Sequence, residues 1–248
     1  MPQALRRPTS PLAFQLNPDL DVPALARAYA EAGRVRIPDF LARDGLVEFY
    51  ENLSTRDDWW HLMNTADGVI ELDRAAREAM STEAHAALDE EVHAIARRAF
   101  QYRYEGLRVP DGESTGDADP LDAFAELMGS EPMLDLLRAV TGATDLAFTD
   151  GQATAYGPGD FLTCHDDDVA GKNRLAAYVF GMTPHWRVEF GGLLMFHEDG
   201  GACVTGHVPR FNSLDLFRVP RLHSVSMVTP AAPGRRYSVT GWLRAGTR

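Results

Sequence analysis

The first 143 residues carry apolar side chains at the three- and four-residue spacing of amphipathic helices. One helix is expected from Pro23 to Gly33, because proline suits a first helical position and glycine an end. Asp44 is expected to cap a second helix that runs to about Leu53. The longest helix is expected to start near Ser81, and its apolar face would consist of Leu88, Val92, Ile95, Ala96, Ala99 and Phe100.

Other segments of this half predict shorter elements. Alternating apolar residues in 34–40 predict a strand, and 59–63 is expected to be extended. Residues 108–119, which are rich in Pro, Gly and Asp, are expected to form a loop. Two helices near 121–128 and 131–141 follow, and Gly142 ends the second.

After Thr144 the pattern changes to short apolar runs separated by Gly, Pro and Asp clusters, which is typical of a sandwich or barrel. The expected strands are Ala147–Ala155, Arg174–Met182, Gly192–Phe196, Ala202–His207, Ser213–Phe217, Ser224–Val228 and Arg236–Leu243. The predicted fold class is α+β, with a double-stranded β-helix (jelly roll) core and an N-terminal helical layer. Residues 1–18 are expected to be a loosely ordered arm. Residues 19–248 are expected to be one domain, with 19–143 as mainly helical support and 144–248 as the jelly roll.

Composition narrows the classes of partner. The net charge of −12 disfavours nucleic acid, because an acidic surface repels phosphates. No apolar run approaches the ~18 residues of a membrane span, and no apolar signal core follows Arg6 and Arg7. Two cysteines do not make a disulfide framework. A cytoplasmic protein without a nucleic-acid or membrane partner is the expectation.

Candidate chemistry is concentrated between Tyr156 and Asp167. In a strand, residues two apart point to one face, so His165 and Asp167 would aim an imidazole and a carboxylate at one point. His223, which opens a later strand, is the best third ligand. Two histidines and one carboxylate on one face of an octahedron are typical of non-haem iron oxygenases.

Other groups compete with this hypothesis or stand outside it. His197 and His207 are alternative third ligands, although neither is followed by an Arg-x-Ser strand at a suitable interval. His61 and His185 have no partner motif. Cys164 neighbours a candidate ligand but is expected to pack on the other strand face.

A second cluster lies on the last strand. Arg236, Ser238 and Thr240 share one face, where a guanidinium and a hydroxyl could clamp a carboxylate. A dicarboxylate co-substrate would need such an anchor at the end away from the metal. Arg235 could instead cap the turn after Pro233 and Gly234.

In order along the chain, these motifs resemble the prolyl 4-hydroxylase-like branch of the 2-oxoglutarate/iron(II) oxygenases. The matching pieces, within about 144–243, are Tyr156, Gly159–Leu162, His165-x-Asp167, Arg174–Val179, Glu189–Leu194, Phe211–Asn212, Leu216–Phe217, His223–Val225 and Arg236–Trp242. The helical lead-in is similar but less specific.

The resemblance implies roles for seven residues. His165, Asp167 and His223 would ligate Fe(2+), and Arg236 would bind the distal carboxylate of 2-oxoglutarate, with Ser238 as a second contact. Tyr156 would hydrogen-bond the co-substrate. Some prolyl hydroxylases have a tyrosine where this chain has Gly181, so that contact is missing or comes from Tyr178.

The implied reaction is hydroxylation of a prolyl residue of a protein, with O2 consumed, 2-oxoglutarate converted to succinate and ascorbate as a supporting reductant. A free amino acid or other small molecule is an alternative substrate, because substrate loops vary on one core. A halogenase on this core would lack the carboxylate ligand, and Asp167 argues against that. A non-catalytic metal-binding jelly roll is the alternative from another class, and intact candidates at every position argue against it.

Overall fold

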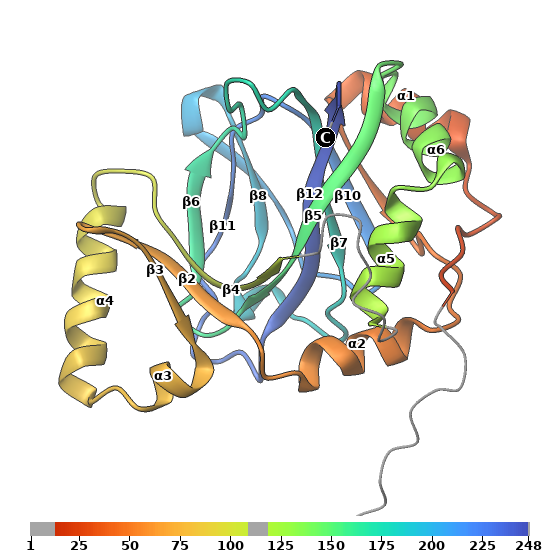
Figure 1. Cartoon of the computed structure of the whole chain (residues 1–248). Helices are drawn as coiled ribbons and strands as arrows, with labels where there is room; N and C mark the ends of the chain where they lie inside the picture. Colours follow the sequence, from red (N-terminus) through yellow and green to blue (C-terminus); the bar gives the residue numbers. More distant parts are fainter. Residues whose placement is uncertain (1–12, 109–118, 248) are drawn as a thin grey trace, which may run out of the picture.

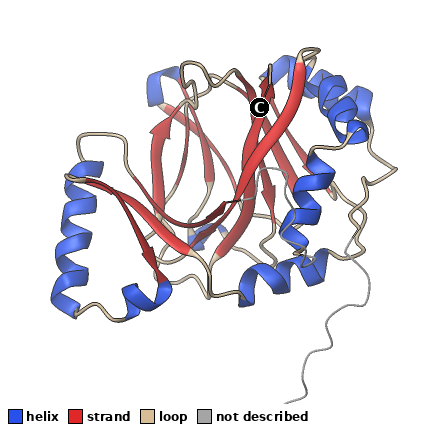
Figure 2. Cartoon of the chain, viewed as in Figure 1, coloured by secondary structure: helices blue, strands red, loops and turns tan. Residues whose placement is uncertain are grey.

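The computed structural model describes residues 13–108 and 119–247, and Figures 1 and 2 show strands at the centre with helices on two sides. The helices are α1 (Val22–Ala32), α2 (Leu46–Thr55), α3 (Arg74–Glu78), α4 (Thr82–Ala96), α5 (Pro120–Met128) and α6 (Glu131–Thr141), with short 3-10 turns at Val188–Phe190 and Asp199–Gly201. The predicted loop 108–119 lies almost wholly outside the described residues.

Strands occur in both halves of the sequence. They are β1 (Arg34–Pro38), β2 (Trp60–Thr65), β3 (Gly68–Asp73), β4 (Tyr102–Arg108), β5 (Leu146–Tyr156), β6 (Phe161–His165), β7 (Arg174–Gly181), β8 (Leu194–Glu198), β9 (Cys203–His207), β10 (Ser213–Arg218), β11 (His223–Val225) and β12 (Arg236–Ala245). They form one antiparallel sheet in the order β1-β10-β7-β12-β5-β4-β6-β11-β8-β9, and β2 joins β4 and β3 off this path.

The sheet curls until its two limbs face each other. Ala177 and Val179 of β7 and Phe217 of β10 pack in one apolar cluster with Leu194 and Phe196 of β8, from the opposite limb. This curled antiparallel sheet with helices confirms the predicted α+β jelly-roll class.

The first half of the chain is less purely helical than expected. It supplies β1 at one edge of the sheet and β4 between β5 and β6, so it completes the sheet as well as covering it. β4 was missed because the helical pattern was extended to Phe100, whereas α4 ends at Ala96. The alternation in Tyr102–Arg108 is a strand signal of its own.

Local chemistry explains most helix ends. The Asp21 carboxylate accepts a hydrogen bond of 3.0 Å from the Ala24 amide at the start of α1, and Gly33 ends that helix in the left-handed conformation. Helix α4 starts near Ser81 as predicted, and the Ser81 side chain caps it. The prediction for Asp44 is wrong, because Gly45 occupies the N-cap of α2 without a side-chain bond.

The main core lies between the sheet and helices α1, α2, α5 and α6, which gather on one side of the molecule in Figure 1. Phe124 of α5 stacks on Phe180 of β7 with ring centroids 4.9 Å apart. Of the predicted loose arm, 1–12 lies outside the described residues. Phe14, by contrast, is buried in the core, and Leu16 forms a β-bridge with Leu41, because these apolar side chains find a hydrophobic surface to cover.

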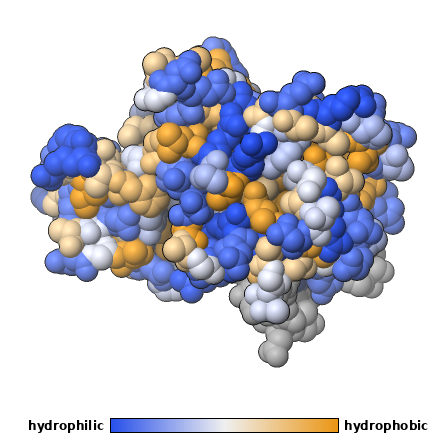
Figure 3. All heavy atoms as spheres, turned by 90° about the horizontal axis from the view of Figure 1, so that it is seen from above, coloured by the Kyte–Doolittle hydropathy of each residue, from blue (hydrophilic) through white to orange (hydrophobic). Residues whose placement is uncertain are grey.

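The face shown in Figure 3 mixes hydrophilic and hydrophobic residues over its whole extent. Within the part of the chain that the structure describes, every helix is too short or too polar to cross a membrane.

Candidate functional site

His165, Asp167 and His223 converge at one end of the space between the two sheet limbs. One potential ligand atom from each lies within 4.8 Å of the others. The Nε2 atoms of His165 and His223 are each 3.4 Å from an oxygen of Asp167. Among the described residues, this is the one group of three or more such side chains close enough to hold a metal ion. The structure therefore brings the predicted triad together.

Strand pairing places the two histidines. His223 of β11 lies opposite His165 of β6 in the antiparallel register, and the ring centroids are 4.1 Å apart. Each Nδ1 faces a backbone carbonyl, that of Thr163 at 3.1 Å and that of Arg221 at 2.8 Å. A proton on Nδ1 that donates to the carbonyl leaves Nε2 as the metal-binding atom.

Asp167 reaches the site differently from the prediction. β6 ends at His165, and Asp167 follows in the left-handed region with a φ of 64°. The carboxylate thus converges through a turn, and not through the two-residue repeat of a strand. Asp166 and Asp168 are exposed, and so is Cys164, whose predicted packing is wrong.

Protonation suits a cation at this point. Burial first, and then the charge of His165, lower the pKa of His223 to about 4, so its imidazole is neutral near pH 7. Burial alone would raise the pKa of Asp167, but the hydrogen bond from His165 and the charges of both imidazoles lower it overall. A divalent metal binds a neutral imidazole and an ionised carboxylate, and the shifts of His223 and Asp167 favour these states.

The triad opens into a cavity of about 250 Å³ between the sheet limbs. Its walls include three of the four predicted co-substrate residues, Tyr156, Tyr178 and Arg236, whereas Ser238 is not among the lining residues. Residues that sequence reasoning did not place here also line it: Phe100, Tyr102, Tyr104, Gln152, Thr154 and Leu162.

Arg236 is a buried cation without a counter-ion. Its side chain is 4 % exposed, its Nη1 has no hydrogen-bond partner, and none of the described carboxylates forms an ion pair with it. Its guanidinium carbon lies 5.1 Å from the centre of the Tyr156 ring. A buried guanidinium of this kind calls for an anion, and the carboxylate of a small acid fits that need.

Ser238 and Tyr178, the other predicted co-substrate contacts, both have hydrogen-bond partners within the protein. The Ser238 hydroxyl is 2.8 Å from that of Thr154, which lines the cavity. The Tyr178 hydroxyl donates to the carbonyl of Asp150 at 3.1 Å. A contact between Tyr178 and a co-substrate stays a prediction.

The glycine at the position of the family's tyrosine has a steric reason. A Cβ on Gly181 would lie 2.2 Å from the backbone carbonyl oxygen of Arg210. A larger residue there would displace the loop before β10, so the departure belongs to the packing of this chain.

The rival ligands are engaged elsewhere. The Nε2 of His197 is 2.7 Å from the Ser224 hydroxyl, and the Nδ1 of His207 is 2.8 Å from the Asp215 carboxylate. Neither histidine belongs to the triad.

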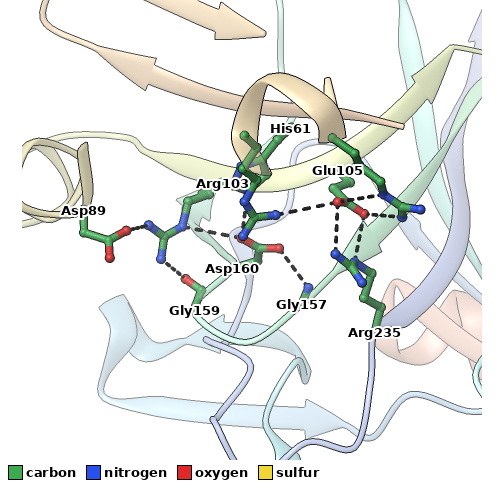
Figure 4. A network of polar contacts seen from close by, with 10 residues as sticks. His61, Asp89, Arg103, Glu105, Gly157, Gly159, Asp160 and Arg235 are labelled. Carbon is green, nitrogen blue, oxygen red and sulfur yellow. Dashed lines mark hydrogen bonds and ion pairs between the residues drawn. The ribbon is translucent and has the colours of Figure 1, made fainter. Parts of the chain in front are cut away.

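A buried aspartate next to the cavity braces the turn after Tyr156 (Figure 4). Asp160 accepts a hydrogen bond of 2.8 Å from the Gly157 amide, and its other oxygen lies 3.0 Å from His61 and 3.5 Å from Arg103. His61, which has no partner motif in the sequence, therefore has a partner in the structure. No sequence pattern indicates this pair, because the two residues are 99 positions apart in the chain.

A second buried acid, Glu105, fixes the residue beside Arg236 (Figure 4). Glu105 pairs with Arg235 at 2.9 Å and with Arg74 at 2.8 Å. Burial alone would raise the pKa of Glu105, but the Arg74 hydrogen bond and the charge of Arg235 lower it overall. Arg235 is thus held in an ion pair and does not merely cap a turn, which leaves Arg236 for the cavity.

Comparison with known proteins gives a family match over the part of the chain that holds this site. Residues 151–244 match the 2OG-Fe(II) oxygenase superfamily. This matched segment, the oxygenase core, spans less than half of the chain. All three candidate metal ligands and Arg236 lie within the matched residues of this oxygenase core, so the family's iron and 2-oxoglutarate have candidate ligands here.

One curated relative of the oxygenase core is a prolyl hydroxylase. The chain is 38% identical over 96 residues to prolyl 3-hydroxylase OGFOD1 of Xenopus laevis. This match covers 36% of this chain and 18% of that protein. The match thus spans about a fifth of that relative.

Solved structures share the fold of the oxygenase core. A prolyl-4-hydroxylase of Pseudomonas putida has 18% identity and a TM-score of 0.58, with 91% of this chain and 99% of that chain covered. A prolyl hydroxylase of Trichoplax adhaerens, in complex with a hypoxia inducible factor peptide fragment, has 13% identity and a TM-score of 0.61, with 90% and 89% covered. The expected likeness to prolyl hydroxylases is confirmed.

Proposed function

We propose that this chain is an iron(II)- and 2-oxoglutarate-dependent hydroxylase that acts on a prolyl residue of a protein or peptide. The observation that carries the proposal is the pairing, in one cavity, of the His165–Asp167–His223 triad with the uncompensated cation of Arg236. One group fits a divalent metal and the other fits a carboxylate, and a keto-diacid needs both.

Each side chain then has a distinct task. The triad would hold the metal through two imidazole nitrogens and one carboxylate oxygen. Arg236 would hold the far carboxylate of 2-oxoglutarate, which fixes its orientation. Tyr156 and the Ser238–Thr154 hydroxyl pair would contact the same molecule. When bound, iron(II) and 2-oxoglutarate supply, with O2, the oxidation of a C–H bond to C–OH.

The substrate class is supported by the relatives. OGFOD1 and the two solved enzymes are prolyl hydroxylases by name, and the Trichoplax structure holds a peptide. A protein or peptide substrate is therefore proposed ahead of a free amino acid. The cytoplasmic location and the absence of a nucleic-acid partner stay predictions.

The test measures succinate formed from 2-oxoglutarate with iron(II) and ascorbate, and oxygen added to peptides. Wild-type protein is expected to form succinate and to add one oxygen to a proline-containing peptide recovered from a proteome digest. Asp167→Asn is expected to abolish both, whereas Asp166→Asn, which changes an exposed neighbour, should retain them.

Each alternative has its own outcome. If oxygen is added to free amino acids and not to peptides, the substrate is a small molecule and not a protein. Stoichiometric iron binding without succinate formation would indicate a non-catalytic metal-binding jelly roll. Full turnover by Asp167→Asn would overturn the assignment of the ligands.

A further inference from the structure

A row of four aromatic rings runs along one wall of the cavity. Phe100 is 5.8 Å from Tyr102, Tyr102 is 5.5 Å from Tyr104, and Tyr104 is 5.2 Å from Tyr156, measured between ring centroids. All four side chains line the cavity. Exposure falls along the row, from 47 % at Phe100 to 3 % at Tyr156. The row therefore leads from the surface to the interior.

The two ends of this row meet different chemistry. The ring of Phe100, at the exposed end, lies 5.3 Å from that of His165, one of the proposed metal ligands. Tyr156, at the buried end, lies under the guanidinium of Arg236. The buried end thus suits the co-substrate, and the exposed end is left for the molecule that enters from solvent.

The cavity offers nothing to pair with a charged substrate group. Apart from the triad and Arg236, its lining residues are aromatic, aliphatic, hydroxyl, amide or glycine. Burial raises the pKa values of Tyr102, Tyr104 and Tyr156, so these phenols stay neutral. A charged group that passes Phe100 into the buried part of the cavity would lose part of its water shell without a partner, which is costly.

The wall is also held firmly. Tyr102 and Tyr104 belong to β4, which pairs with β2 along one edge and with β6 and β5 along the other. On the adjoining positions of the same strand, Arg103 and Glu105 are buried in the ion pairs of Figure 4. A rigid aromatic surface loses little entropy when it binds a ligand.

Resting on the proposed function, we propose that Phe100 and Tyr102 form the substrate subsite, which selects an uncharged saturated ring such as that of peptidyl proline. Proline-containing segments dock on aromatic-lined grooves because their backbone is already extended and the flat rings cover the pyrrolidine surface. The same two rings would reject acidic and basic side chains at the reacting position.

The experiment measures binding without turnover. Protein loaded with manganese(II) and 2-oxoglutarate is offered two peptide libraries that have the same random flanks and either proline or glutamate fixed at the centre. Wild-type protein is expected to retain more of the proline library than of the glutamate library. Phe100→Ala and Tyr102→Ala should each lower that preference about tenfold, since an aromatic contact contributes about 0.5–1.5 kcal/mol beyond its buried area.

Two comparisons make the result specific. Trp60→Ala removes an aromatic ring of similar exposure, 45 %, that does not line the cavity, and its preference should equal that of the wild type. The affinity for 2-oxoglutarate should fall when Tyr156 is changed to Leu and should change little for Phe100→Ala. If Tyr102→Ala fails to fold, Phe100→Leu gives the second test, with an intermediate preference expected.

The outcomes separate this inference from the proposed function. A wild type without a preference for proline, or an unchanged preference in Phe100→Ala, overturns the subsite even if succinate forms. A clear preference for proline that both variants lose supports the subsite, even if no succinate is formed in the turnover assay and the hydroxylase proposal fails.

Discussion

Arg174 donates a hydrogen bond of 3.1 Å from its Nη1 to the backbone carbonyl of Asp167. The same nitrogen is 3.6 Å from the Asp167 carboxylate, and the guanidinium stacks on Trp242 at 3.6 Å from the ring centroid. Asp167 has a left-handed backbone, which a non-glycine residue adopts only at some cost. Arg174 thus stabilises the turn that brings the carboxylate to the two imidazoles.

Arg174→Leu is therefore expected to weaken metal binding. Groups that orient metal ligands typically contribute 10- to 100-fold to affinity, so we expect a loss of about that size. Manganese(II) titration by calorimetry measures it. Arg187→Leu, which removes an exposed arginine, is the control. An unchanged affinity in Arg174→Leu would show that Asp167 is positioned by its own backbone.

The sequence predicts that the triad converges, but the two-residue repeat of a strand explains only part of this convergence. The motif order placed His165, Asp167 and His223 in one fold. The two-residue repeat does not apply to Asp167, because β6 ends at His165. A backbone φ of 64° at Asp167 depends on the turn and on Arg174, and such long-range support leaves no periodic signal.

The aromatic wall was within reach of sequence reasoning. Tyr102 and Tyr104 alternate with Arg103 and Glu105, which is the pattern of a strand with two different faces. The apolar spacing of the preceding helix was extended to Phe100 and hid this pattern. The pair of His61 with Asp160, by contrast, joins residues 99 positions apart. Only tertiary structure reveals that contact.

Arg236→Gln is expected to raise the dissociation constant for 2-oxoglutarate about a hundredfold. Hydrogen bonds to charged groups contribute about 1.5–3 kcal/mol, and the far carboxylate would lose its cation. Calorimetric titration of 2-oxoglutarate into manganese-loaded protein measures the change. Arg235→Gln should have a much smaller effect, because that arginine pairs with Glu105. Equal losses in both variants would place the anchor on the pair and not on Arg236 alone.

Glu105 gives the protein an acid-sensitive ion-pair cluster. Its pKa in the folded protein is below the ordinary 4.5, so it stabilises the fold fully above about that pH. This contribution is lost as the pH falls through the lowered value. Glu105→Gln should reduce the free energy of unfolding near pH 7 by about 1.5–3 kcal/mol, because the partly exposed Arg74 and Arg235 lose their charged acceptor.

Urea unfolding at a series of pH values tests the role of Glu105. The variant should show a shallower decline of stability below pH 4.5 than the wild type, while Glu31→Gln, at an exposed position, should follow the wild type. An acid decline of equal slope in Glu105→Gln would assign the sensitivity to other carboxylates.

Gly181 connects the packing of this chain to its departure from the family pattern. An added Cβ would lie 2.2 Å from the Arg210 carbonyl oxygen, so even alanine forces the backbone of one strand or of the loop to move. Overpacking of this kind costs about 1–3 kcal/mol, and Gly181→Ala should lower the free energy of unfolding in urea by that amount. Gly234→Ala is the matched control, because its Cβ would meet no atom within 4 Å. A tyrosine at 181 should destabilise the protein further and should not strengthen 2-oxoglutarate binding. Tighter binding in a stable Gly181→Tyr protein would show instead that the loop moves easily and that the missing phenol is a functional loss.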